Sequence, residues 1–409
     1  MKKVTLITGY YYPEDTAIGL YNSQLVEYLE CKGYTVCVVT GFPNYPQWRI
    51  RDDYKKKHTF LSEKIGSTKV YRYKQYVPSS PTFFKRILLI FDFTFGSLIN
   101  IFKIKKTDII ICVVPYTTTI FLGWLLKLKT SAIIWNHVQD FEFDAAKQTG
   151  VSKSDNMFKK IFFNVLFKLE TFFLNKGCVN STISLNMLNK LEKKSKSDTF
   201  YFPNWIDQDL INPENNKTHK YLSPENENFK ILYSGNIGDK QDWDSFFKFT
   251  VKLDSEKVDL IIVGDGSKKD WLLDKIKDSN NIKYYKPVDY KELSSLLCST
   301  DLHVLFQKQD VVDSVMPSKL LGMMASAKPS LILGNASSEV KNIINESNGG
   351  FYISNNDLDE CVSIVKDLID NPEKSRLIGA NARKYIVAQF SKERVLSSFE
   401  TKLSKIIGV

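Results

Sequence analysis

The chain has 409 residues, 43% of them hydrophobic, so it can bury more than one core and we expect about two or three domains. Its six cysteines form no C-x-x-C pair and four histidines accompany them, which argues against a disulfide scaffold and against a structural zinc site. The formal net charge of +10 calls for an acidic partner, which would be nucleic acid, anionic lipid or a phosphorylated substrate.

Apolar runs of strand length alternate with helical patterns through the first half of the chain. Strands are expected at residues 4–8, 35–40, 69–73, 109–114 and 132–135, and helices at 23–32, 84–102 and 119–128. Because the chain opens on the first of these strands, no secretory signal is expected. The longest apolar run, 87–102, is too short to cross a membrane and carries Asp92 and Asn100, so we expect no transmembrane helix.

The second half repeats this alternation. Strands are expected at residues 230–233, 258–263, 282–285, 302–305 and 330–333, and helices at 242–253, 269–278, 290–297, 318–325, 338–345 and 358–368. Two such halves predict an α/β fold with two doubly wound parallel sheets, and ligands are expected at the carboxyl ends of the strands. The polar stretch 212–219 is interpreted as a linker.

Two segments of the second half have the composition of phosphate-binding turns. Residues 231–240 form an apolar strand, a turn of serine, glycine and asparagine, and a lysine. Residues 313–319 form a helix start with proline, serine and lysine in its first turn. Small turn residues, a helix N-terminus and lysine are all groups that bind a diphosphate. Each segment alone is a turn of the kind that commonly joins a strand to a helix in α/β proteins. Together they indicate an enzyme that uses a nucleotide sugar.

Two stretches combine phenylalanine with lysine and arginine, at residues 83–106 and 158–176. Helices of this composition suit an anionic membrane surface, with the apolar face among the headgroups and the lysines on the phosphates. The alternative is that both are buried helices whose lysines extend to solvent. Nucleic acid is not expected as a partner, because no binding motif accompanies the charge.

The order of these signals resembles glycosyltransferase family 4, the retaining transferases of GT-B fold, over essentially the whole chain. Within that family it is most similar to the fucosyl and N-acetylfucosaminyl transferases of bacterial exopolysaccharide and O-antigen biosynthesis. The segments that carry the resemblance are residues 11–15 with Gly19, 40–46, 136–140 with Asp144, 182–184, 202–205, 233–241, 263–266 and 315–320.

The resemblance implies a GT-B architecture with two Rossmann-like domains facing a central cleft. The expected acceptor-binding domain spans residues 1–205, the nucleotide-sugar-binding domain 206–385, and a C-terminal helix in 386–409 packs back on the first domain. Expected donor-binding residues are Gly19, Gly235, Asn236, Lys240, Gly264, Val288, Met316, Pro317, Ser318 and Lys319. Expected catalytic residues are His137, Asp140, Lys240 and Asp313. Expected acceptor-binding residues are Tyr12, Glu14, Asp15, Gln139 and Asp144.

The sequence departs from the family at the donor site. Many members carry two glutamates eight residues apart, where this chain has Ser314 and Gly322. Asp313 either takes the place of the first glutamate or caps the following helix. The departure puts the identity of the nucleotide in doubt more than it puts activity in doubt.

Several candidate residues also have structural interpretations. Glu14 or Asp15 would take the proton of the acceptor hydroxyl, or would cap the next helix. A lone histidine such as His137 is commonly structural, but its acidic neighbours favour a functional cluster. The D-x-D of Asp242 and Asp244 opens a helix, so we expect capping there and neither a required metal nor another cofactor.

Retaining transfer of a deoxy or N-acetylamino-deoxy sugar, such as L-FucNAc or fucose, is the expected reaction. The donor would be a nucleotide diphosphate sugar, UDP favoured, and the acceptor a polyprenyl-diphosphate-linked saccharide at the inner face of the cytoplasmic membrane. The alternatives are a nucleotide-sugar epimerase of the same architecture and a catalytically degenerate interaction protein, for which the two missing glutamates are the argument.

Overall fold

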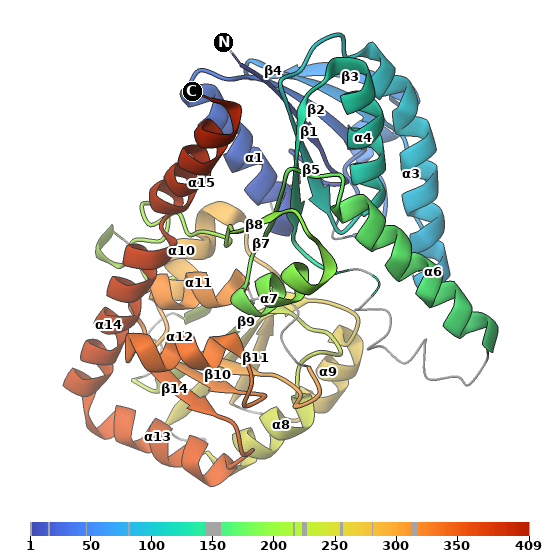
Figure 1. The fold of residues 1–409 in the computed structure, drawn as a ribbon. Coiled ribbons are helices and arrows are strands. Elements are labelled where there is room, and N and C mark those ends of the chain that lie inside the picture. Colours follow the sequence, from blue (N-terminus) through green and yellow to red (C-terminus); the bar gives the residue numbers. More distant parts are fainter. Residues whose placement is uncertain are drawn as a thin grey trace. The chain divides into compact units, whose positions relative to one another are not determined.

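The computed structural model describes residues 2–14, 17–45, 47–80, 82–141, 143, 157–215, 217–222, 227–253, 257–279, 281–311 and 318–408. The chain divides into two compact units, Met1–Pro203 with Ser398–Val409, and Asn204–Ser397 (Figure 1). The second unit begins two residues before the predicted boundary, because Ile206 is bridged to Ser391 within that unit.

The first unit is built on an eight-stranded sheet in the order β3-β4-β2-β1-β5-β6-β7-β8. Its strands are β1 (Lys3–Ile7), β2 (Thr35–Gly41), β3 (Phe60–Ile65), β4 (Thr68–Tyr73), β5 (Ile109–Val114), β6 (Ile133–Val138), β7 (Val179–Thr182) and β8 (Asp198–Tyr201). All neighbours are parallel except the β3–β4 hairpin. Every residue of β5 is buried, as expected for a central strand covered on both faces.

Helices cover this sheet. They are α1 (Ala17–Cys31), α2 (Asp52–Lys55), α3 (Phe83–Lys103), α4 (Thr118–Thr130), α6 (Met157–Leu174) and α7 (Leu185–Lys194). The last helix, α15 (Lys392–Ile407), returns to this unit from residue 398 onward. There the Phe399 ring packs 4.7 Å from the rings of both Trp135 and Phe202, measured between centroids. This aromatic cluster explains why the end of the chain belongs to the first unit.

The second unit has a six-stranded parallel sheet in the order β11-β10-β9-β12-β13-β14. Its strands are β9 (Phe229–Asn236), β10 (Val258–Asp265), β11 (Ile282–Tyr285), β12 (Leu302–Phe306), β13 (Ser330–Leu333) and β14 (Gly350–Ile353). Its helices are α8 (Trp243–Lys252), α9 (Lys269–Ile276), α10 (Leu293–Cys298), α11 (Ser318–Ala325), α12 (Glu339–Ser347), α13 (Leu358–Asp370) and α14 (Pro372–Phe390). Short 3₁₀ turns lie at Pro213–Asn215, Lys220–Leu222 and Tyr290–Glu292.

Strand order reverses between β9 and β12. From β9 the chain crosses through α8 to β10 on one side, and from β12 it crosses through α11 to β13 on the other. In open parallel sheets this reversal opens a crevice at the carboxyl ends of the two central strands, where ligands bind. The first predicted phosphate segment contains the end of β9, and Ser318 and Lys319 of the second open α11 after β12, so the topology brings these residues to one edge of the sheet.

The predicted fold class, two α/β units with doubly wound parallel sheets, is confirmed, but one local interpretation is wrong. The predicted linker 212–219 lies inside the second unit and is attached to α10 and its carboxyl end. The backbone N–H of Asn212 donates to Ser294 Oγ at 3.2 Å, and that of His219 donates to Ser299 Oγ at 2.9 Å. Serine hydroxyls therefore satisfy a polar backbone that composition alone made resemble a linker.

No helix in the part of the chain that the structure describes is long and apolar enough to cross a membrane.

Candidate functional site

The turn after β9 depends on glycine at two neighbouring strand ends. Gly235 has φ +131°, a conformation that side-chain-bearing residues rarely adopt. On β10, Gly264 pairs with Gly235, and a Cβ at position 264 would lie 2.0 Å from the Gly235 carbonyl oxygen. The backbones of the two strands can approach this closely only because position 264 is glycine, whereas a Cβ at position 235 would instead meet the Lys319 side chain. The predicted donor residue Gly264 is thus required by strand packing, and its predicted donor contact stays a prediction.

Three side chains brace the turn from within. Tyr233 Oη donates to the Asn236 carbonyl oxygen at 2.5 Å, and Trp243 Nε1 donates to the Gly238 carbonyl oxygen at 3.2 Å. Gln241 Oε1 accepts from the Gly238 N–H at 3.0 Å. The turn therefore has a defined shape before any ligand binds.

The D-x-D sequence caps a helix, as predicted. Asp242 is the N-cap of α8, and its carboxylate accepts from the Ser245 N–H at 3.0 Å. In the described ranges no group of three or more His, Cys, Asp or Glu side chains is placed to hold a metal ion. That the reaction needs no metal stays a prediction.

Lys319 brings the two predicted phosphate segments together. It lies in the first turn of α11, and its Nζ would be 3.3 Å from a Cβ at position 235. The ammonium donates to Tyr233 Oη at 3.1 Å and lies 4.6 Å from the centroid of the Tyr233 ring. Burial lowers the pKa of Lys319 to about 8, since an ammonium is poorly solvated there. A cation is thus held against the glycine turn.

Three other donor-site candidates, Asn236, Lys240 and Val288, lie at or after the carboxyl ends of β9 and β11. Lys240 and Asn236 are exposed, and the Lys240 carbonyl oxygen accepts from the Lys308 N–H at 3.2 Å. Val288 is half-buried and follows β11. Ser318 is the first residue of α11, and its side chain is not among those that the structure describes. Asp313, Met316 and Pro317, with Ser314, lie outside the described residues.

In the first unit, His137 is a buried and fully bonded side chain. Gln139 Nε2 donates to His137 Nε2 at 2.9 Å, so His137 Nδ1 carries the proton and donates to Ser181 Oγ at 2.9 Å. Burial lowers the His137 pKa to about 3, which keeps the ring neutral. The ring also packs 4.8 Å from Phe202, measured between centroids. His137 is therefore poorly placed to act as a base, and its predicted contact with the donor sugar stays a prediction.

Ser181 on β7 is a residue that sequence reasoning missed. Besides His137, it accepts from Trp135 Nε1 at 2.7 Å and donates to the Asn136 carbonyl oxygen at 3.3 Å. It sets the histidine tautomer, and the pairing of β6 with β7 brings it there. Only the adjoining segment 182–184, which does not include Ser181, stood out in the sequence. Asp140 is half-buried two residues after the end of β6, and Asp144 lies outside the described residues.

Glu14 is turned into the first unit. Its Oε1 accepts from the backbone N–H groups of Asn44 at 2.7 Å and Tyr45 at 2.8 Å, which ties the loop after β1 to the loop after β2. Burial raises the Glu14 pKa to about 7, although both N–H groups oppose the shift. The predicted choice between helix cap and proton acceptor thus omitted its main structural role, which is to join two loops.

Gly19 and Arg72 hold the same loop from other sides. A Cβ at Gly19 would lie 2.7 Å from the Glu14 carbonyl oxygen, so α1 can pack on the loop only with glycine there. Arg72 is fully buried and donates to the carbonyl oxygens of Tyr12 and Gly41 and to the Glu63 carboxylate. Tyr12 is itself 51% exposed and remains available to a ligand. Asp15 lies outside the described residues.

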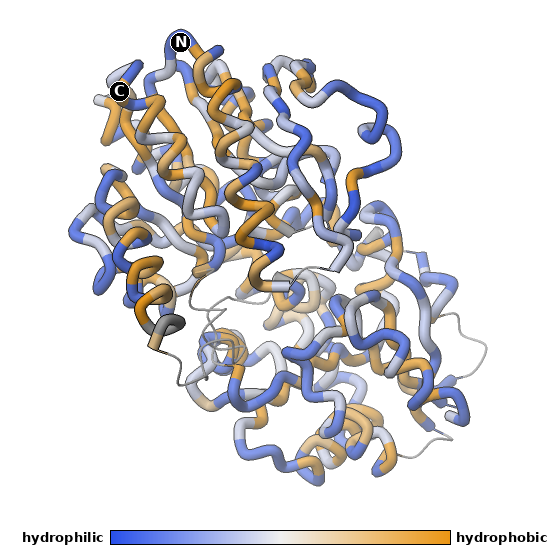
Figure 2. The backbone as a smooth tube through the Cα atoms, turned by 90° about the vertical axis from the view of Figure 1, so that its right-hand side faces the viewer, coloured by the Kyte–Doolittle hydropathy of each residue, from blue (hydrophilic) through white to orange (hydrophobic). Residues whose placement is uncertain are grey.

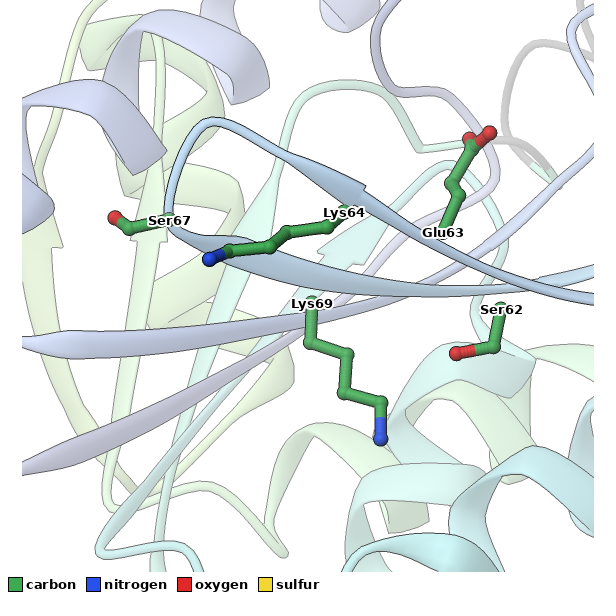
Figure 3. A pocket seen from close by; sticks show the side chains of 5 residues that line it. All are labelled: Ser62, Glu63, Lys64, Ser67 and Lys69. Atoms are coloured by element: carbon green, nitrogen blue, oxygen red, sulfur yellow. The ribbon is translucent and has the colours of Figure 1, made fainter.

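A shallow cavity of about 370 Å³ lies elsewhere on the first unit (Figure 3). The residues that line it are Ser62, Glu63, Lys64, Ser67 and Lys69. All of them come from β3, β4 or the turn between these strands. No predicted site residue lines it, so we assign it no function.

Comparisons with known proteins identify the chemistry of the second unit. The family model described as glycosyl transferases group 1 matches residues 214–385. WcaI of Escherichia coli (strain K12), a protein assigned to colanic acid biosynthesis as a glycosyl transferase, is 30% identical to the chain. That similarity covers 95% of this chain and 96% of the relative.

Solved structures support the architecture. Sucrose-phosphate synthase from Thermosynechococcus elongatus superposes with a TM-score of 0.75 at 12% identity, over 100% of both chains. Anabaena Alr3699/HepE in complex with UDP and glucose superposes with a TM-score of 0.68 at 11% identity, over 99% of this chain and 100% of that one. At such identities the match shows the fold alone, and it confirms the predicted GT-B class.

The Glu14 clamp makes a prediction about stability. Because the folded-state pKa of Glu14 lies above its ordinary value, the free energy of unfolding should fall as pH rises from about 4.5 to about 7. Glu14→Gln keeps an oxygen acceptor and removes this dependence, whereas Glu14→Ala leaves two N–H groups unpaired and should cost roughly 1–3 kcal/mol at pH 8. Urea unfolding across this pH range measures both effects.

Glu27→Gln on the exposed face of α1 is the matched control and should change neither quantity. Full stability of Glu14→Ala at pH 8 would show that the carboxylate does not clamp the two loops.

Proposed function

Because the chain belongs to the group 1 glycosyl transferases, we propose that it moves a sugar from a nucleotide diphosphate donor to a lipid-linked saccharide in bacterial surface polysaccharide synthesis. The product would be an O-antigen, a capsule or an exopolysaccharide. One observation carries the donor half of this proposal: Lys319 meets the Gly235 turn where strand order reverses.

The donor diphosphate would lie between the glycine turn and the start of α11. Its oxygens would accept from Lys319, from Lys240 and from backbone N–H groups at the helix N-terminus. Such donors stabilise the charge that develops on the diphosphate as the glycosidic bond breaks. With two lysines and a helix dipole available, the proposal requires no divalent metal and no other cofactor.

UDP is the favoured nucleotide. A structural neighbour, Anabaena HepE, has been solved with UDP. The relative WcaI bears on the product and not on the nucleotide, since it is assigned to the synthesis of colanic acid. By the family 4 resemblance of its motifs, the sugar would be deoxy or N-acetylamino-deoxy, such as L-FucNAc or fucose. Position 322 has no glutamate for the ribose, and a Cβ there would lie 3.0 Å from Leu297 Cδ1. The base and the ribose would therefore be held by other groups, among them residues near Val288.

The proposed reaction retains the anomeric configuration. The acceptor hydroxyl would attack from the face on which the diphosphate leaves, and the leaving phosphate oxygen would take its proton. A neutral His137 with both ring nitrogens bonded fits this route, because the route needs positioning and charge stabilisation and no basic side chain.

Loss of either lysine should weaken donor binding. Lys319→Met removes a half-buried cation and should weaken UDP binding roughly 10- to 100-fold at pH 7, and the exposed Lys240→Met should cost less than this. Isothermal titration with UDP, GDP, CDP and dTDP measures both effects and identifies the base. Lys366→Met, an exposed lysine of α13, is the control and should bind as the wild type does.

Transfer assays complete this test. Wild-type protein should release UDP from a UDP-sugar only when lipid-linked saccharide is present. If no nucleotide binds the wild type, the donor proposal is wrong, and binding without transfer to any lipid acceptor would favour the catalytically degenerate alternative.

We also propose that the first unit lies on an anionic membrane surface through residues 83–106 and 158–176, as a peripheral protein of the inner face. The supporting observation is an apolar stripe along α3 that repeats every three or four residues. The exposed side chains of the stripe are Phe84, Leu88, Phe91, Phe95, Ile99 and Phe102. The opposite face of α3, with Leu89, Phe93 and Ile101, is buried. The exposed apolar stripe therefore faces away from the core of the first unit and is available to a second cover.

A similar stripe runs along α6, with exposed Met157, Ile161, Val165, Leu169 and Phe172. The two helices touch where Phe83 stacks on Phe163, with ring centroids 5.7 Å apart. The side of the first unit that carries α3 and α6 in Figure 1 faces the viewer in Figure 2. Hydrophobic stretches run along the helices on this side.

Charge favours lipid as the cover. At the carboxyl end of α3, Phe102 is 66% exposed and is followed by exposed Lys103, Lys105 and Lys106. Lys129 of α4 donates to the Phe102 carbonyl oxygen at 2.7 Å, which adds α4 to the same corner. Apolar tips surrounded by lysines match the interface of an anionic bilayer, where phosphates lie just above the acyl chains.

Vesicle binding tests this surface. The wild type should sediment with phosphatidylglycerol vesicles and far less with phosphatidylcholine vesicles. The double variant Phe95→Ser/Phe102→Ser should lose roughly tenfold or more in vesicle affinity, because two phenylalanines no longer insert. The control is Val251→Ser/Leu377→Ser, which removes two similarly exposed apolar side chains from the second unit.

Equal vesicle affinity of the test and control variants would exclude α3 as the docking surface. If instead the wild type self-associates in solution and Phe95→Ser/Phe102→Ser makes it monomeric, a second copy of the chain covers the stripe.

A further inference from the structure

Tyr233 has no assigned role in donor binding, yet its hydroxyl accepts a hydrogen bond from the Lys319 ammonium. Its side chain is 2% exposed, and its ring packs against Trp243 with centroids 4.9 Å apart. Trp243 in turn donates to the Gly238 carbonyl oxygen. The phenol therefore has a fixed position beneath the glycine turn.

We propose that Tyr233 is a positioning residue that orients the Lys319 ammonium toward the donor diphosphate and couples nucleotide binding to proton uptake by that lysine. This inference rests on the proposed function, because it takes the diphosphate to lie beside Lys319. Tyr233 itself would not touch the nucleotide.

Hydrogen-bond counting supports the orientation. The Tyr233 hydroxyl uses its proton on the Asn236 carbonyl oxygen and accepts from Lys319 Nζ with a lone pair. An ammonium has three N–H donors, so this contact leaves two for phosphate oxygens. The ring face at 4.6 Å adds a cation–π attraction that keeps the ammonium over the tyrosine.

The electrostatic surroundings explain the coupling. From β9 the ammonium meets Tyr233, whose own pKa burial raises, so the phenol stays neutral. From α8 the uncharged Trp243 packs behind that ring, and Asp242 is bonded to the Ser245 N–H. Within the described residues no carboxylate forms an ion pair with Lys319, and burial brings its pKa down to about 8.

An anion that binds to the ammonium favours the charged form and raises the lysine pKa. As the pH rises through about 8, the free protein loses the charge on Lys319, so binding of a diphosphate in this range should be accompanied by proton uptake. Affinity should be highest below pH 8 and fall as pH rises through 8.

Isothermal titration of UDP at pH 8, in buffers of different ionisation enthalpy, measures affinity and proton uptake together. Tyr233→Phe keeps the ring and removes the acceptor of the Lys319 N–H. It should weaken UDP binding roughly 3- to 10-fold, move the fall in affinity to lower pH and raise proton uptake at pH 8 above the wild-type value.

Two further variants isolate the coupling. In the Lys319→Met background, Tyr233→Phe should cause no further loss, because the residue acts through the lysine. Tyr352→Phe is the matched control, since Tyr352 also donates to a backbone carbonyl, that of Asn335 at 2.7 Å, beside β13 and β14 at the far edge of the same sheet.

The outcomes separate the two proposals. If UDP binds the wild type and Lys319→Met weakens it, but Tyr233→Phe changes neither affinity nor proton uptake, Tyr233 has no positioning role. Equal losses from Tyr233→Phe in both backgrounds would also overturn the inference, because they would mean a general effect on the turn. Absence of proton uptake in the wild type at pH 8 would exclude the coupling without any variant. If Lys319→Met binds UDP normally, the donor site itself is wrong.

Discussion

The donor site that we propose depends on one lysine ammonium, that of Lys319, held against a glycine turn. Lys319 is held there by a neutral phenol, so the cost of desolvating its charge is offset only in part. A site that is electropositive and incompletely satisfied attracts an anion more strongly than a surface lysine would. The two glycines at 235 and 264 make this geometry possible, because side chains there would separate the strands or displace the lysine.

In the first unit, buried polar groups hold the loops at the carboxyl ends of β1 and β2 in one conformation. Arg72 donates to the backbone carbonyls of Tyr12 in the first loop and of Gly41 at the end of β2, and Glu14 accepts from backbone N–H groups of the second loop. Such groups leave exposed residues like Tyr12 free to meet a ligand. Rigid loops on a rigid sheet reduce the entropy that ordering an acceptor would cost.

Much of the fold could be predicted from the sequence, because central strands such as β5 are continuous apolar runs between helical patterns. The strands that escaped are short and polar, such as β7 and β8, or belong to a hairpin, such as β3. In the site, glycine and lysine positions were readable from local pattern. The roles of Tyr233 and Ser181 were not, since each depends on a partner distant in sequence, 86 residues away for Tyr233 and 44 for Ser181, that only the folded chain brings near.

The measurement that tests this account most directly is a crystal structure of the protein with bound UDP. The account predicts that a diphosphate oxygen lies within hydrogen-bond distance of Lys319 Nζ, beside the Gly235 turn, while Tyr233 Oη keeps its contacts with Lys319 and Asn236. A diphosphate bound elsewhere in the second unit, with Lys319 still bonded only to Tyr233, would contradict it.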